Sequence, residues 1–138
     1  MEIKLTKTEA AFEFTATNNQ ATLPICASPS LGAEQNGFRP MELMLTGLAS
    51  CLSIDVLTIL YKQKQDVEKY KVKVSATRTD SEPALFENIT VSLYVWGKVS
   101  ALKLDKALTL TKEKYCSVYH ILKPTAHINT QYFINDEN

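Results

Sequence analysis

The sequence predicts an α+β fold, in which strands and helices occupy separate stretches of the chain. Residues 2–26 alternate loosely between apolar and polar side chains, and residues 40–62 form one long, largely apolar run without an internal proline. After residue 69, two alternating segments, two helical segments and a last alternating segment follow one another. Strands and helices that are segregated in this way, without repeated strand-helix units, are typical of the α+β class.

The N-terminal alternation predicts three short antiparallel strands within residues 2–26. Apolar residues stand in pairs at positions 3 and 5, 12 and 14, and 23 and 25, and short polar joins separate the pairs. This period of two indicates half-buried strands. Residues 27–39 contain one proline and two glycines, which indicates a loop that leads to the long apolar run.

Residues 40–62 are predicted to form a single long helix. Pro40 suits the first helical position, and Glu42 is favourable in the first turn. The apolar residues cover more than the one stripe that a surface helix needs, so we expect burial on most of the circumference, in the core or against a partner. A transmembrane span is the weaker alternative, because Glu42 and Asp55 interrupt the run before about 18 uncharged apolar residues have passed.

The C-terminal part is predicted to form a β-β-α-α-β unit. Residues 70–76 and 89–95 alternate as paired strands, and residues 127–134 alternate as a last strand. Between them, Ser100 is placed to cap an amphipathic helix. The inward face of that helix is expected to consist of Leu104, Ala107, Leu108 and Thr111. A break at residues 115–117 then precedes a short helix that ends at Lys123-Pro124.

The length and charge of the chain indicate one cytoplasmic domain. A chain of 138 residues can form a single domain, 1–138, with one core. Lysine plus arginine and aspartate plus glutamate both number 15, so neither a nucleic acid nor an anionic membrane is an expected partner. The N-terminus lacks the charged lead and apolar core of a secretion signal. In a reducing compartment, the 3 cysteines are not expected to form structural disulfides.

Two of the cysteines are candidates for redox chemistry. Cys51 lies in the middle of the predicted long helix and, taken alone, is typical of an inert buried residue. Cys116 begins a short helix, where free N–H groups and the helix dipole favour the reactive thiolate. If the fold brings them together, they form a redox pair. Cys26, beside Pro24 and Ile25 on a strand, is predicted to be a core residue.

The motifs around these cysteines resemble those of the OsmC/Ohr family of thiol-dependent hydroperoxide-detoxifying proteins. The shared features are Pro40-Met41-Glu42-Leu43, then Cys51, and the run from Glu113 to Val118 that contains Cys116. The resemblance implies an OsmC-like fold and an intertwined homodimer, with the long helices back to back and each active site at the subunit interface. It also implies that Cys51 is the peroxidatic thiolate, that Cys116 condenses with its sulfenic acid, and that a dithiol, such as a lipoylated protein, restores both thiols.

The sequence departs from this family at the residues that activate the thiolate. Peroxidases of the family carry a glutamate ten residues before the first cysteine, and that position is Met41 here. Glu42 is nine residues before Cys51, which places it about 180° around an ideal helix. Glu42 therefore remains a weak candidate for positioning the thiol, and a structural carboxylate at the helix N-terminus is the alternative. These departures resemble a less characterised, YhfA-like branch of the family.

The activating arginine of the family, which lies on an early strand, also lacks a counterpart. The chain has two arginines, Arg39 directly before the long helix and Arg78 on a later strand. Arg39 is the weak candidate to replace it. Asp55 follows Cys51 by one helical turn and should share its face, where a carboxylate disfavours a second negative charge on sulfur.

Two functional hypotheses follow. The first is a thiol-dependent enzyme that reduces small apolar organic hydroperoxides in oxidative or osmotic stress defence. The alternative is a non-catalytic or redox-sensing OsmC-like dimer that binds an apolar or electrophilic small molecule. Cys116 and His120 share a helix face and His127 follows, which could suggest a metal site. Because no further ligand has suitable spacing, a metal site is disfavoured. No cofactor is expected.

Overall fold

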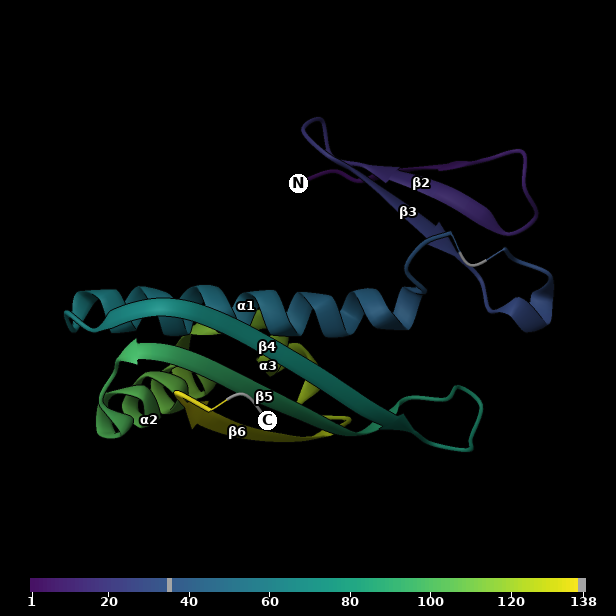
Figure 1. The fold of residues 1–138 in the computed structure, drawn as a ribbon. Coiled ribbons are helices and arrows are strands. Elements are labelled where there is room, and N and C mark those ends of the chain that lie inside the picture. The colour runs from purple at the N-terminus through teal and green to yellow at the C-terminus, as the bar shows by residue number, and fades with distance from the viewer. Residues whose placement is uncertain (35, 137–138) are drawn as a thin grey trace. The chain divides into compact units, whose positions relative to one another are not determined.

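The computed structural model describes residues 1–34 and 36–136, which fall into two compact units, residues 1–44 and 45–138. In the N-terminal unit, β1 (Lys4–Lys7), β2 (Glu13–Thr17) and β3 (Thr22–Cys26) form an antiparallel sheet in the order β1-β2-β3 (Figure 1). These are the three strands that the period of two predicts. A short 3-10 helix, η1 (Pro29–Leu31), follows in the predicted loop. Whether the two units make one domain stays a prediction.

The C-terminal unit contains a second sheet, made of β4 (Asp66–Arg78), β5 (Phe86–Lys98) and β6 (His127–Ile134). The predicted pairing of β4 with β5 is confirmed, and it is antiparallel. β6 pairs with the other edge of β5 and runs parallel to it. A parallel pair needs a crossover of a dozen or more residues, which the helices between β5 and β6 provide.

Four helical elements accompany this sheet. They are α1 (Pro40–Lys62), α2 (Ala101–Leu110), a π-helical turn η2 (Thr111–Tyr115) and α3 (Ser117–Leu122). In Figure 1, α2 and α3 lie behind the strands of the C-terminal unit. The core of this unit consists of fully buried apolar side chains from α1, β5 and α2. These are Leu48, Leu52, Val56 and Leu60, then Ile89, Val91, Leu93 and Val95, and Leu104 and Ala107.

The prediction that α1 is buried on most of its circumference is wrong for the chain by itself. Its buried residues recur at every fourth position and so form a single stripe, whereas Ile54 is 66% exposed and Tyr61 57% exposed. Within the described residues, α1 is also the one helix long and apolar enough to cross a membrane, with 22% of its apolar stretch buried. A single helix of this kind is weak evidence for a membrane span, since core helices share these properties. Part of the apolar surface of α1 is therefore exposed to solvent.

The prediction that Ser100 caps α2 is half right. Ser100 occupies the N-cap position, but its hydroxyl makes no capping hydrogen bond. Its backbone carbonyl instead accepts hydrogen bonds from the N–H groups of Lys103 and Leu104, at 3.1 and 3.0 Å.

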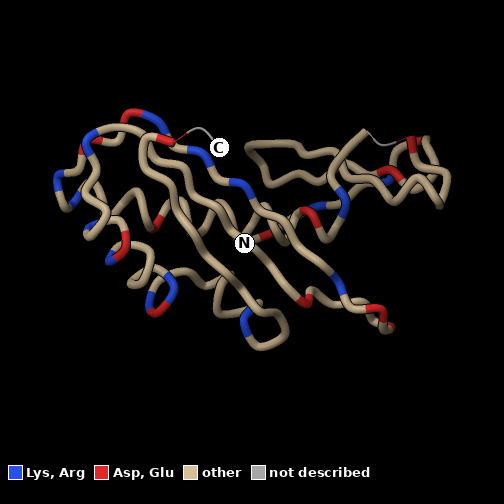
Figure 2. Tube along the Cα trace, turned by 60° about the horizontal axis from the view of Figure 1, so that its bottom comes forward, with Lys and Arg blue, Asp and Glu red and all other residues tan. Residues whose placement is uncertain are grey.

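Charged residues are scattered along the whole chain rather than gathered in one basic stretch, as Figure 2 shows.

Two leucines of α2 provide a matched test of the core. Leu104 is fully buried and Leu102 is 65% exposed, although both lie on the same helix. We expect Leu104→Ala to lower the free energy of unfolding by about 2–5 kcal/mol, because it removes buried methyl groups and leaves a cavity. Leu102→Ala should change it by no more than about 0.5 kcal/mol. Denaturant unfolding of the two variants measures both values, and equal losses would contradict the burial described here.

Candidate active site around Cys51 and Cys116

The two candidate cysteines are held by different local structures. Cys51 lies in the middle of α1 next to fully buried Leu52, and its own side chain is half-buried. Cys116 follows the π-helical turn, where its φ of −72° and ψ of 99° break the helix before α3 begins. Its N–H donates to the carbonyl of Thr111 at 2.9 Å, and its side chain has no exposed surface. The break in the helix therefore directs Cys116 into the core.

The fold brings the two cysteines together with an acidic residue. The sulfur atoms of Cys51 and Cys116 and a carboxylate oxygen of Asp55 all lie within 4.8 Å of one another. Both cysteines are free thiols. Asp55 reaches this group because it stands one helical turn after Cys51 on the same face of α1. Residues 51 and 116 thus meet although 64 residues separate them in the sequence.

Burial is the main influence on the chemistry of Cys116. It raises the pKa of the Cys116 thiol to about 12, and the Cys51 thiol and the negative charge of Asp55 raise it as well. The backbone N–H of Tyr119 donates to the Cys116 sulfur at 3.4 Å and acts in the opposite direction. The helix N-terminus therefore favours the thiolate, as predicted, but this one N–H contact does not offset the loss of solvation. Cys116 is a neutral thiol near pH 7.

The structure shows the interactions of Glu42 and the surroundings of the two arginines. The Glu42 carboxylate accepts a hydrogen bond from the backbone N–H of Arg39 at 2.9 Å, which supports the alternative that it stabilises the start of α1. The Arg39 side chain is exposed. The guanidinium group of Arg78 donates twice to the carbonyl of Ala84, at 3.0 and 2.6 Å, and so braces the turn between β4 and β5.

The remaining cysteine and the two histidines lie outside the group formed by Cys51, Asp55 and Cys116. Cys26 is 3% exposed and donates from its sulfur to the carbonyl of Gly37 at 3.1 Å, so its predicted role in core packing is confirmed. His120 packs edge-to-face against Tyr119, and His127 is exposed on β6. Neither histidine belongs to the group of candidate metal ligands that the described residues form.

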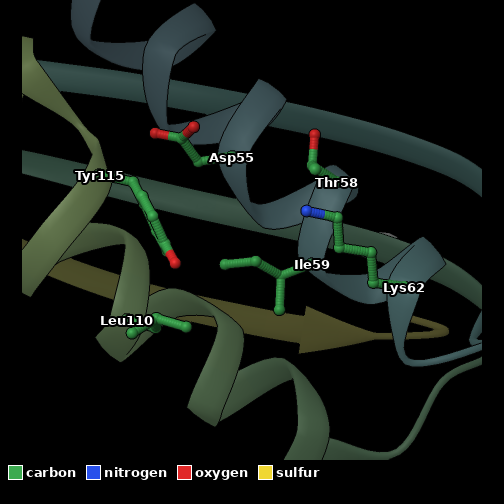
Figure 3. Close-up of a pocket in the computed structure, with 6 residues that line it drawn as sticks. All are labelled: Asp55, Thr58, Ile59, Lys62, Leu110 and Tyr115. Atoms are coloured by element: carbon green, nitrogen blue, oxygen red, sulfur yellow. The ribbon is translucent and has the colours of Figure 1, made fainter.

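A cavity of about 300 Å³ adjoins Asp55. Figure 3 shows side chains from α1, α2 and the π-helical turn around this cavity, with the Asp55 carboxylate at one end and Lys62 at the other. The lining residues are Asp55, Thr58, Ile59, Lys62, Leu110 and Tyr115. Sequence reasoning missed all of these except Asp55. The signal was present, because positions 55, 58, 59 and 62 continue the face of α1 that begins at Cys51, and Tyr115 directly precedes Cys116.

The shifted pKa values predict a loss of stability in alkaline solution. Burial raises the pKa of Cys116 from 9.0 to about 12. It also raises the pKa of Tyr70 from 10.0 to about 12, against a smaller opposing effect of Ser53. Because the unfolded chain loses these protons first, the free energy of unfolding should be fully retained below about pH 9 and should fall between about pH 9 and 12.

Denaturant unfolding under reducing conditions, measured from pH 7 to pH 12, tests this alkaline behaviour. Tyr70→Phe removes one of the two groups, so its stability should fall less steeply above pH 10 than that of the wild type. A free energy of unfolding that is flat or rises over this interval would contradict the buried, neutral state of both side chains.

A protein-family model described as "OsmC-like protein" matches residues 32–131, the stretch that contains both cysteines and Asp55. The chain belongs to the OsmC-like protein family. Among curated relatives, it is 36% identical to Protein YhfA of Escherichia coli (strain K12) over 94 residues, which cover 67% of this chain and 70% of that protein. The resemblance to the OsmC/Ohr family, and to its YhfA-like branch, is thereby confirmed.

Solved structures share the OsmC-like fold with this chain. A hypothetical protein from Aquifex aeolicus VF5 superimposes with a TM-score of 0.86 at 28% identity, covering 99% of this chain and 97% of that one. The organic hydroperoxide resistance protein OhrB of Bacillus subtilis superimposes with a TM-score of 0.67 at 17% identity, covering 96% and 98%. These matches confirm the predicted α+β, OsmC-like fold.

Proposed function

We propose that this OsmC-like protein reduces organic hydroperoxides through the Cys51–Cys116 pair. The observation that carries the proposal is the convergence of two free thiols within 4.8 Å, one of them half-buried and the other fully buried. Its relatives of known structure include proteins named for organic hydroperoxide resistance, which share its fold.

The proposed reaction has three steps. The Cys51 thiolate attacks the terminal oxygen of the hydroperoxide, the O–O bond breaks, and the products are Cys51 sulfenic acid and, after uptake of a proton, an alcohol. The Cys116 thiol then attacks the sulfenic sulfur, so that a disulfide forms and water leaves. An external dithiol, such as a lipoylated protein, reduces this disulfide and becomes a disulfide itself.

Burial assigns different roles to the two sulfurs. Cys51 is half-buried, so a small substrate can reach it, whereas Cys116 has no exposed surface. The high pKa of Cys116 keeps it a thiol until Cys51 has been oxidised, which suits a resolving residue that attacks only an adjacent sulfenic acid. The apolar side chains of Ile59 and Leu110 in the neighbouring cavity suit a small apolar hydroperoxide.

A homodimer belongs to this proposal. The side chains of Ile54 and Tyr61 leave apolar surface exposed on α1, and a second copy of the chain would cover it. Ile54→Lys should shift the mass measured by sedimentation equilibrium toward that of the 15.5 kDa monomer. A wild-type mass equal to that of the monomer at micromolar concentration would contradict the dimer.

One observation favours the alternative of a redox-sensing or small-molecule-binding dimer. The buried Oδ2 atom of Asp55 has no hydrogen-bond partner among the described residues, and Asp55 lies beside both sulfurs. Its negative charge disfavours a thiolate there and would slow the attack on a peroxide. The rate of oxidation therefore separates catalysis from sensing or binding.

The deciding experiment is a thiol count after addition of one equivalent of cumene hydroperoxide to the reduced chain. Catalysis predicts rapid loss of two thiols per chain in the wild type and no rapid loss in Cys51→Ser. Cys26→Ser serves as the matched control and should behave as the wild type, because Cys26 is engaged in core packing. Thiol loss no faster than that of free cysteine would support the binding alternative and contradict catalysis.

A further inference from the structure

Cys51, Asp55 and Cys116 offer a set of ligand atoms that hydroperoxide chemistry does not need. Reduction of a peroxide uses the two sulfurs, but the proposed steps give no role to a carboxylate within 4.8 Å of them. We infer that the three side chains form a binding site for a thiophilic divalent cation such as Zn²⁺ when both cysteines are reduced. This inference stands on the geometry alone and does not rest on the proposed peroxidase activity.

The spacing of the donor atoms suits such an ion. Zinc binds cysteine sulfur at about 2.3 Å and carboxylate oxygen at about 2.0–2.2 Å, so tetrahedral geometry places its donors roughly 3.5–4 Å apart. The three donor atoms here already lie within 4.8 Å of one another. The separations of the donor atoms are therefore close to those that a tetrahedral ion requires.

The buried carboxylate of this group also favours binding of a cation. The Oδ2 atom of Asp55 is buried and lacks a hydrogen-bond partner among the described residues, which is costly for a carboxylate. A divalent cation between the three groups would supply the carboxylate with a partner, and its charge would stabilise the bound thiolates.

This set of ligands differs from the metal site that was considered from the sequence and disfavoured. That candidate combined Cys116 with His120 and His127, whereas the fold combines Cys116 with two residues of α1. Three protein ligands leave one tetrahedral position open. Asp55 also lines the cavity of about 300 Å³, so one ligand of the site borders a space that can hold small molecules.

Metal binding and disulfide formation exclude each other in this arrangement. Binding of one divalent ion converts two thiols into metal-bound thiolates and releases two protons to solvent. A two-electron oxidant such as a hydroperoxide takes two electrons from the pair and joins the sulfurs in a disulfide, so both sulfur ligands are lost and the ion leaves. The reduced chain therefore binds the ion and the oxidised chain does not.

The test titrates Co²⁺, as a spectroscopic probe, into the full-length reduced chain in the absence of any peroxide, followed by displacement with Zn²⁺. The wild type should bind one ion per chain with a sulfur-to-cobalt charge-transfer band, and Zn²⁺ should abolish that band. Cys51→Ser, Cys116→Ser and Asp55→Asn should each weaken binding at least about tenfold. Cys26→Ser should bind as the wild type does.

Circular dichroism of each variant establishes that a loss of binding is not a loss of folding. The same readout on the chain with a Cys51–Cys116 disulfide should show no cobalt band. The inference is overturned if the wild type binds no ion, if the bound cobalt lacks a sulfur band, or if Asp55→Asn binds as tightly as the wild type. Because no peroxide is present, these outcomes are independent of whether the protein reduces hydroperoxides.

Discussion

Cys51→Ser should lower the rate of reaction with an organic hydroperoxide by at least about a hundredfold, because a serine hydroxyl does not attack peroxide oxygen at neutral pH. The measurement is the second-order rate constant for consumption of cumene hydroperoxide by the reduced chain, with an excess of a dithiol. The side chain of Cys51 is half-buried on α1, so serine should fit there without loss of folding.

Cys116→Ser separates the first step from the second. The variant should still lose one thiol to the first equivalent of hydroperoxide, because Cys51 is unchanged, but the sulfenic acid should persist and react with dimedone. Turnover through an intramolecular disulfide should cease. A Cys116→Ser variant that still forms the wild-type disulfide, or a Cys51→Ser variant that keeps its rate, would contradict these roles.

Asp55→Asn should act in the opposite direction and accelerate thiol chemistry. The substitution keeps the shape of the side chain but removes a negative charge within 4.8 Å of both sulfurs. That charge raises the pKa of Cys116, and a carboxylate so close repels negative charge that develops on either sulfur. We expect iodoacetamide alkylation of Cys51, measured at pH 7 in the Cys26→Ser background, to become roughly tenfold faster.

Asp105→Asn is the matched control for this charge effect. Asp105 is an exposed aspartate on α2 and does not belong to the group formed by Cys51, Asp55 and Cys116. Its substitution changes the net charge by the same amount and should leave the alkylation rate unchanged. Slower alkylation in Asp55→Asn would mean that the carboxylate promotes the thiolate, which would overturn its assignment as an opposing charge.

The elements that could be predicted from the sequence are those with strong local signals. Pro40 marks the start of α1, and the alternation in residues 70–76 and 89–95 places β4 and β5. The pairing of Cys51 with Cys116 was expected from the family resemblance rather than from spacing, since no local pattern joins residues so far apart in the chain. The placement of Asp55 followed from one turn of helix.

The features that could not be predicted depend on tertiary packing. The pattern of α1 shows that it is apolar all round, but it does not show which stripe the chain itself buries and which stripe it leaves exposed, as at Ile54. Cys116 has a favourable position for a thiolate by local reasoning, and only the complete burial of its side chain reverses that expectation. The cavity beside Asp55 also needs Leu110 and Tyr115 from outside α1.

The most direct test of the account is peptide mapping by mass spectrometry after one equivalent of cumene hydroperoxide has reacted with the reduced chain. We expect a single disulfide between Cys51 and Cys116, loss of two hydrogens from the intact mass, and Cys26 still reduced. A disulfide that includes Cys26, or a Cys51 oxidised to sulfinic acid while Cys116 remains a free thiol, would contradict the claim that these two sulfurs form one redox pair.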